Sequence, residues 1–322
     1  MIERWVAFWD RREAPTTLAL VRILVAAALL GDLLIPWRLD LVPDLWVAPP
    51  FGLGYGAAAR KLPWSLELFG NTPEAAGTLW LVTTLSALLL LTGTLTRLSA
   101  LALALFYAQL SQISPSADRG IDDLLRIACL LLAFSGAGAL WSFDALQRKL
   151  RGLPRITQVP AWPRYLLFLQ VLWVYFSAAT HRNDEDWWLR GGYSALGKIL
   201  ADPHFARFTP GTAGSIYPLT QLGTLATMLF EFTAPLMLLW TWYERTPRWP
   251  GKLRYFAVLL RVRWIWLALG ALFHVGIALS MRLGMFPYGM LALYPVFLSP
   301  GEIEEALAWL RRQRERSRST LD

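Results

Sequence analysis

Runs of about twenty apolar residues constrain this chain more than any other feature. Examples are "LALVRILVAAALLGDLLIP", "LWLVTTLSALLLLTGTL" and "LGTLATMLFEFTAPLMLLWTWY". A helix of about 20 residues crosses a hydrocarbon core of about 30 Å, and in lipid only helices or closed barrels satisfy every backbone polar group. The runs lack the alternating pattern of barrel strands. The sequence therefore predicts an all-α fold, a polytopic integral membrane bundle of helices.

The apolar runs predict about eight transmembrane helices, with seven or nine as open alternatives. The predicted spans are 17–36, 75–95, 98–113, 122–140, 165–180, 219–243, 262–281 and 286–297.

The basic residues orient these spans, because short cytoplasmic loops carry an excess of Lys and Arg. Basic segments follow the fourth, sixth and eighth spans, for example "QRKLRGLPRITQVPAWPR" and "LRRQRERSR". With eight spans, the N- and C-termini are both predicted to be cytoplasmic. The predicted organisation is a cytoplasmic N-terminal segment, 1–16, a transmembrane domain, 17–300, and a basic cytoplasmic tail, 301–322.

The composition excludes several functions. The single cysteine, Cys129, cannot form an internal disulfide or a CxxC site. The three histidines have no metal-binding spacing such as HExxH, so no metal site is predicted. The net charge of +8 comes from basic residues between the spans, where membrane topology requires them, so no nucleic-acid partner is predicted.

Ionisable residues inside spans are costly and need a reason. Arg22 and Asp32 lie ten residues apart in the first span, which is about 15 Å along a helix, so they are not expected to pair. Arg22 is near the inner end, where its side chain can extend to water. Glu231 lies in the middle of the sixth span, and Pro235 removes the N–H that would bond its carbonyl. This pattern predicts a kink at which Glu231 either pairs with a buried arginine or lines a polar pocket.

Charged residues also open the fourth span. Asp122, Asp123 and Arg126 have the spacing of intrahelical pairs, and acids favour the first turn of a helix. Their arrangement is typical of a capped, charge-balanced helix start; the alternative is a carboxylate facing an outward cavity. His274 in the seventh span is either a hydrogen-bonded core residue or part of a site.

The segment "VYFSAATHRNDEDWW", residues 174–188, has the pattern of a membrane exit: an apolar helix, charges and then interfacial tryptophans. With "GIDDLLRIACLLLAF", "LFEFTAPLMLL" and "LFHVGIALSMRLGMFPYGMLALYPVFLSP", it also resembles the horizontally transferred transmembrane (HTTM) family. The resemblance covers about 17–300. That family includes the membrane domain of vitamin K-dependent γ-carboxylases and many bacterial relatives. It implies a helical bundle with its working face outside the cytoplasm, a quinone-like or lipid ligand, and the inner (plasma) membrane of a bacterium.

In the γ-carboxylases, a pair of lysines occupies the positions of His181 and Arg182, and the second lysine is the base that deprotonates the quinol. Arginine stays protonated and cannot be that base, so true vitamin K-dependent carboxylation is not expected. Arg182 can bind an anion, and His181 can accept a proton near neutral pH. By this resemblance, the candidate catalytic residues are His181, Arg182 and His274, and the candidate substrate-binding residues are Asp122, Asp123, Arg126, Glu231, Asp186 and Trp187.

Two functions follow as hypotheses. One is a membrane-embedded modification or maturation factor with a polar extracytoplasmic site, acting on a lipid-like cofactor or a secreted peptide. The alternative is a non-catalytic subunit or scaffold that binds a protein partner in a larger membrane complex. The sequence therefore leaves open whether the chain is an enzyme. A carrier of a small lipophilic molecule is disfavoured, because the sequence shows no inverted repeat.

Overall fold

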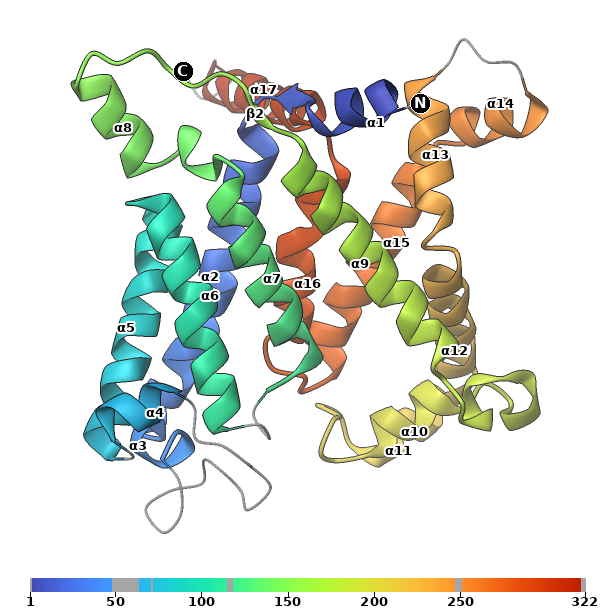
Figure 1. The fold of residues 1–322 in the computed structure, drawn as a ribbon. Coiled ribbons are helices and arrows are strands. Elements are labelled where there is room, and N and C mark those ends of the chain that lie inside the picture. The colour runs from blue at the N-terminus through green and yellow to red at the C-terminus, as the bar shows by residue number, and fades with distance from the viewer. Residues whose placement is uncertain (1, 48–63, 71, 115–117, 247–250, 320–322) are drawn as a thin grey trace. The chain divides into compact units, whose positions relative to one another are not determined.

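Helices form almost all of the structure, a computed structural model that describes residues 2–47, 64–70, 72–114, 118–246 and 251–319 (Figure 1). Within these ranges the only strands are β1 (Arg12–Glu13) and β2 (Val159–Pro160), which pair antiparallel, apart from one isolated bridge between Ala206 and Met281. The predicted all-α fold class is confirmed.

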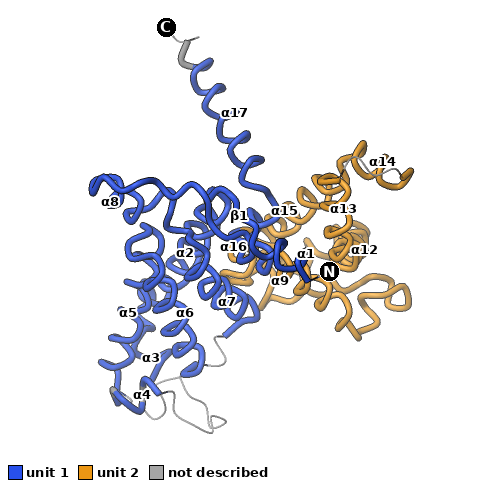
Figure 2. Tube along the Cα trace, turned by 45° about the horizontal axis from the view of Figure 1, so that its top comes forward, with its two compact units in different colours: residues 1–167, 292–322 blue, residues 168–291 orange. Residues whose placement is uncertain are grey.

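The contacts divide the chain into two compact units, which are described separately (Figure 2). Unit 1 comprises 1–167 and 292–322, and unit 2 comprises 168–291. The predicted division into 1–16, 17–300 and 301–322 concerns the membrane boundary and stays a prediction.

Unit 1 contains α1 (Ile2–Trp9), α2 (Thr16–Arg38), α3 (Val42–Leu45), α4 (Trp64–Phe69), α5 (Pro73–Thr92), α6 (Thr96–Ile113), α7 (Gly120–Phe134), η2 (Ala137–Ala139), α8 (Phe143–Leu150), η5 (Tyr294–Phe297) and α17 (Pro300–Ser319). Unit 2 contains η3 (Glu185–Trp187), η4 (Leu189–Gly191), α10 (Ala195–Ala201), α11 (Pro210–Ser215), α12 (Tyr217–Phe232), α13 (Leu236–Arg245), α14 (Lys252–Leu259) and α15 (Val262–Ser280). Two helices, α9 (Trp162–Thr180) and α16 (Phe286–Leu293), begin in one unit and end in the other.

Helix α2 is the centre of unit 1. It packs against α5 and α7, and the returning segments η5 and α17 cover it as well. Leu18, Val25 and Leu29 are fully buried along its length. The neighbouring α5 has clear ends: Thr72 caps its first turn by accepting a hydrogen bond from the N–H of Ala75 at 3.2 Å, and Gly93 ends it with φ of 68°. This turn leads directly into α6.

Helix α12 has the same central position in unit 2, where it packs against α10 and α15. The approach of α10 to α12 is close because glycine occurs on each helix. A Cβ at Gly197 would lie 2.9 Å from Thr220 Oγ1, and a Cβ at Gly223 would lie 2.6 Å from Leu196 Cδ2. Larger residues at these positions would therefore push the two helices apart.

Both units expose leucine-rich helix faces. On α5, Leu81, Leu85 and Leu88 are exposed, and on α15, Leu269, Leu272 and Leu279 are exposed. Contiguous apolar surface of this kind is rare on a protein surrounded by water. It is the surface expected of helices that contact lipid.

Three described helices have the length and hydropathy to cross a membrane: α2, α5 and α15. Helices α12 and α13 add a fourth if the bent pair is one span. By length and composition, the described chain therefore has three or four candidate spans, fewer than the eight predicted. The difference arises because α7 has only 15 residues and α16 only 8, while polar residues interrupt α6 and α9.

The kink predicted near Glu231 is present. Helix α12 ends at Phe232, α13 begins at Leu236, and the two axes differ by 61°. Pro235 cannot donate to the carbonyl of Glu231, and the N–H of Ala234 bonds that carbonyl instead, at 3.2 Å. The break therefore follows from one proline, and it lies next to the acid.

Candidate functional site

A buried ion pair joins Arg182, two residues after the end of α9, to Glu231 of α12 in unit 2. Arg182 Nη2 lies 2.8 Å from Glu231 Oε1 and 2.7 Å from Oε2, and the two side chains are 16% and 5% exposed. The interpretation of Glu231 as the partner of a buried arginine is therefore confirmed. Burial lowers the pKa of Arg182, and the charge of Glu231 opposes this effect. We call these two residues the Arg182 pair.

Aromatic and sulfur groups enclose the Arg182 pair. The guanidinium lies 3.7 Å from the ring centroid of Trp187, and Nη1 lies 3.3 Å from Met228 Sδ. The indole N–H of Trp188 donates to the carbonyl of Arg182 at 3.0 Å. These contacts hold the backbone and the side chain of Arg182 in place, so its guanidinium is already occupied by protein groups.

His181 differs from its neighbour because its side chain is exposed. Its Nδ1 lies 2.8 Å from the carbonyl oxygen of Ser177. A carbonyl can only accept a hydrogen bond, so Nδ1 carries the proton and Nε2 of the neutral ring is an acceptor. The exposed imidazole therefore has Nδ1 bonded to the backbone of α9 and Nε2 available as an acceptor.

Asp186 lies four residues after Arg182 and makes a separate polar contact. It accepts hydrogen bonds from Ser194 Oγ at 2.7 Å and from Lys198. The hydrogen bonds from Lys198 and Ser194 lower the pKa of Asp186. This carboxylate ties η3 to α10 and is already satisfied there.

His274 is fully buried in α15. Its Nε2 lies 2.6 Å from Tyr175 Oη of α9, and the rings of Phe273 and Phe286 contact it. This is the hydrogen-bonded core position that the sequence allowed.

The acids at the start of α7 lie in unit 1, around an arginine that precedes the helix. Arg119 lies 2.6 Å from Asp32 Oδ2 of α2 and 3.0 Å from Asp122 Oδ2. Tyr107 of α6 donates to Asp122 at 2.9 Å and to Asp32 at 3.2 Å. We call these four residues the Arg119 cluster. Burial by itself lowers the pKa of Arg119, but hydrogen bonds to Asp32 and Asp122 outweigh it and leave that pKa raised.

Asp122 also caps α7. Its Oδ2 accepts from the backbone N–H of Arg119 at 2.8 Å, and its side chain is 2% exposed. One turn on, Arg126 binds Asp123, Ser111 and Asp118, with Asp118 Oδ1 at 2.9 Å. These bonds correspond to the capped, charge-balanced helix start predicted from the sequence.

Arg22 of α2 is completely buried and does not reach water. It donates to the carbonyls of Leu90 at 2.6 Å, Leu91 at 2.8 Å and Trp141 at 2.6 Å. The first two belong to the last turn of α5, where the usual i+4 N–H donors lie beyond the helix end, and the N–H of Gly93 also bonds the carbonyl of Leu90 at 3.1 Å. The arginine therefore closes the end of α5, so its expected extension to water was wrong.

Sequence reasoning missed Arg119, Tyr107, Tyr175 and Lys198, each of which is the direct partner of a residue it did select. Arg119 had a detectable signal, since it stands three residues before Asp122 at the helix start. The Tyr175–His274 contact joins residues 99 positions apart, and the Tyr107–Asp122 and Lys198–Asp186 contacts join separate elements 15 and 12 positions apart. No pattern in one sequence identifies such partners.

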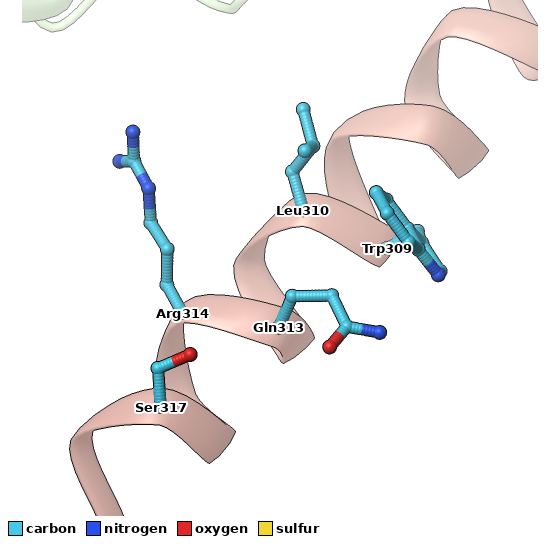
Figure 3. A pocket seen from close by; sticks show the side chains of 5 residues that line it. All are labelled: Trp309, Leu310, Gln313, Arg314 and Ser317. Carbon is cyan, nitrogen blue, oxygen red and sulfur yellow. The ribbon is translucent and has the colours of Figure 1, made fainter. Parts of the chain in front are cut away.

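One pocket in the described part of the chain lies away from these residues. The pocket found there is lined by Trp309, Leu310, Gln313, Arg314 and Ser317, which all belong to α17 (Figure 3). A single helix face encloses nothing, so this is a surface patch. The described residues also hold no group of three His, Cys, Asp or Glu side chains that could bind a metal ion.

Apolar helices of spanning length, exposed leucine faces and buried ion pairs define a helical membrane protein. The HTTM domain family model matches residues 10–248, well over half of the chain. The chain therefore belongs to the HTTM family, as its sequence motifs predicted. No curated protein and no solved structure matched it.

Proposed function

We propose that this chain is a membrane-embedded modification or maturation factor whose polar site lies on the extracytoplasmic face, in unit 2. The observation that carries the proposal is the contrast between adjacent residues. Arg182 is buried and fixed by Glu231 and Trp187, while His181 presents an exposed acceptor nitrogen. A rigid neighbour that holds an accessible base is the arrangement that proton transfer requires.

In this proposal His181 is the base and Arg182 is a positioning residue. Its guanidinium is neutralised by Glu231, so it has little capacity to bind a further anion. The absence of a lysine at this position leaves vitamin K-dependent carboxylation unsupported. The ligand class proposed is a quinone-like or lipid molecule, or a secreted peptide presented at the membrane surface.

The proposed topology has eight spans with both termini in the cytoplasm, in the inner (plasma) membrane of a bacterium. The basic segments between spans support it. Cys129 is buried, so a cysteine introduced elsewhere can be labelled selectively. With an impermeant maleimide on intact cells, Asp184→Cys should react, whereas Arg148→Cys should react only after lysis. The opposite pattern would overturn this orientation.

One experiment tests the site. The protein is purified from its own membrane in nanodiscs, and co-purifying small molecules and chains are identified by mass spectrometry for wild type and His181→Gln. A site at His181 predicts that the variant keeps its thermal stability but loses the ligand, or accumulates unmodified substrate. Glu185→Gln, an exposed residue four positions after His181, is the matched control and should behave like wild type.

A non-catalytic scaffold is the second candidate, and a specific observation favours it. The carboxylates among the predicted site residues are all paired with a cation of this chain. Such pairing is what a purely structural role requires. If His181→Gln retains every co-purified molecule and partner chain, the scaffold is the better account.

A further inference from the structure

Helix α8 of unit 1 carries an exposed apolar stripe that no described segment covers. Phe143, Leu146 and Leu150 are 51%, 48% and 77% exposed. Their spacing of three and four residues places them on one face of the helix. Beyond the helix end, Leu153 and Ile156 are exposed as well.

Basic residues flank this stripe. At 100° per residue, Lys149 lies on one side of it and Arg151 on the other. Both side chains are exposed. The one acid of the helix, Asp144, is turned towards α6. The outward surface of α8 is therefore apolar in the middle and positively charged at both edges.

The start of α8 is fixed at the end of a candidate membrane span. Asp144 accepts hydrogen bonds from the backbone N–H groups of Leu95 and Thr96, both at 2.8 Å, and its own N–H donates to the carbonyl of Gly93 at 3.0 Å. These residues form the turn that follows α5, a candidate span that ends at Thr92. Figures 1 and 2 both show α8 beside this end of α5.

The junction is tightly packed. Arg22 bonds the carbonyl of Trp141, just before α8. A Cβ at Gly93 would lie 2.3 Å from Ser142 Cβ. Ser142 caps α8, accepting from the N–H of Ala145 at 2.9 Å. If α5 crosses the membrane, α8 is therefore held at the depth where hydrocarbon gives way to headgroups.

We propose that α8 is an interfacial helix that binds anionic lipid. Its apolar stripe enters the boundary between headgroups and acyl chains, and Lys149 and Arg151 bind lipid phosphates. An amphipathic helix with basic residues beside an apolar face is suited to this position, and the positive charge complements an anionic leaflet. The proposal is independent of the function proposed for His181.

The test uses the full chain in nanodiscs with single cysteines at Leu146, Leu150 or Lys149, in a Cys129→Ala background, labelled with bimane. Phospholipids with brominated acyl chains quench a fluorophore that contacts them. Labels at positions 146 and 150 should be quenched more strongly than the label at 149. Quenching at 146 should increase when phosphatidylglycerol is added to phosphatidylcholine.

Charge removal separates lipid recognition from simple proximity. The double variant Lys149→Gln with Arg151→Gln should lower the ratio of membrane-bound to unbound α8 by about fivefold per charge removed. The measurement is the loss of the increase in quenching at 146 that phosphatidylglycerol causes. Arg314→Gln with Arg316→Gln, the same charge change in α17, is the matched control and should leave the signal at 146 unchanged. Equal quenching at 146 and 149 would overturn the proposal. So would a label at 146 that is shielded from water but not quenched by bromine, because that result indicates that protein covers the stripe.

Discussion

The Arg119 cluster and the Arg182 pair both neutralise buried or half-buried carboxylates, but they do so with different numbers of charges. In unit 1, one arginine serves two carboxylates, Asp32 and Asp122, and a tyrosine hydroxyl bonds both acids. In unit 2, Arg182 serves a single acid, Glu231, beneath a tryptophan ring. The cluster carries an excess negative charge, whereas the pair is balanced.

This difference shows where each centre is vulnerable. Removing the guanidinium of Arg119 leaves two acids that repel each other with no cation between them, while the backbone N–H at position 119 still bonds Asp122. Removing Arg182 leaves one acid, which can take up a proton and become neutral. The cluster should therefore depend on its arginine more strongly than the pair does.

Arg119→Leu is expected to have the largest effect. Loss of the shared cation should lower the free energy of unfolding by about 4 kcal/mol, below the upper end for breaking a buried ion pair because the Arg119 side chain is 34% exposed. Denaturation of the reconstituted protein measures it. Adding Asp32→Asn should recover part of the loss, because it removes the repulsion between the acids. A cost below that of Arg182→Met would contradict the comparison.

Arg182→Met is expected to cost less, about 3 kcal/mol in the free energy of unfolding. Glu231 loses its partner but can be neutralised by a proton. The double variant Arg182→Met with Glu231→Leu should return close to wild-type stability, since apolar replacement of a whole buried pair is often neutral. If the double variant is as unstable as the single one, the cation–π contact with Trp187 matters more than the charge pair.

A matched pair of tyrosine variants sharpens the comparison. Tyr107→Phe removes a hydroxyl that bonds two acids of the Arg119 cluster, and Tyr175→Phe removes one that bonds His274. Bonds to charged groups are stronger, so the expected losses in unfolding free energy are about 2 kcal/mol and about 1 kcal/mol. Both substitutions keep the aromatic ring, so differential unfolding measures the hydroxyls alone. Equal losses of unfolding free energy would mean that the negative charges of Asp32 and Asp122 do not strengthen the hydrogen bonds of Tyr107.

Much of the fold was readable in the sequence. Hydropathy predicted helices, and helices occur at all eight predicted positions, because apolar helices in lipid need only local hydrogen bonds. The break at Pro235 was predictable because it depends on one missing N–H. The number of spans was not predictable, because the composition of the short helices α7 and α16 does not show whether they cross the membrane.

The candidate site was predictable only in part. An arginine partner was one of two roles predicted for Glu231, but Arg182 is 49 residues away, and sequence spacing gave no preference for it over Arg22. Arg22 itself illustrates the limit: its carbonyl acceptors come from the end of α5 and from Trp141, which only the tertiary fold brings together. Local rules found the capping role of Asp122, since it acts within one turn.

The smallest effect on stability is expected for an ion pair that is partly exposed to solvent. Asp186 and Lys198 form an ion pair in unit 2 whose side chains are 20% and 66% exposed, and hydrogen bonds from Lys198 and Ser194 lower the pKa of Asp186. The stability that Asp186 contributes is therefore present above its ordinary pKa and is lost as the pH falls through its lowered value. Lys198→Met should move the pKa of Asp186 back up, shrinking that window, with little change in stability at neutral pH. Carbon-13 NMR of labelled aspartate measures the shift, and Lys198→Arg is the control that keeps the charge. An unchanged pKa in Lys198→Met would mean that Ser194 alone sets it, and a large loss of stability would show that exposed pairs here act like the buried ones.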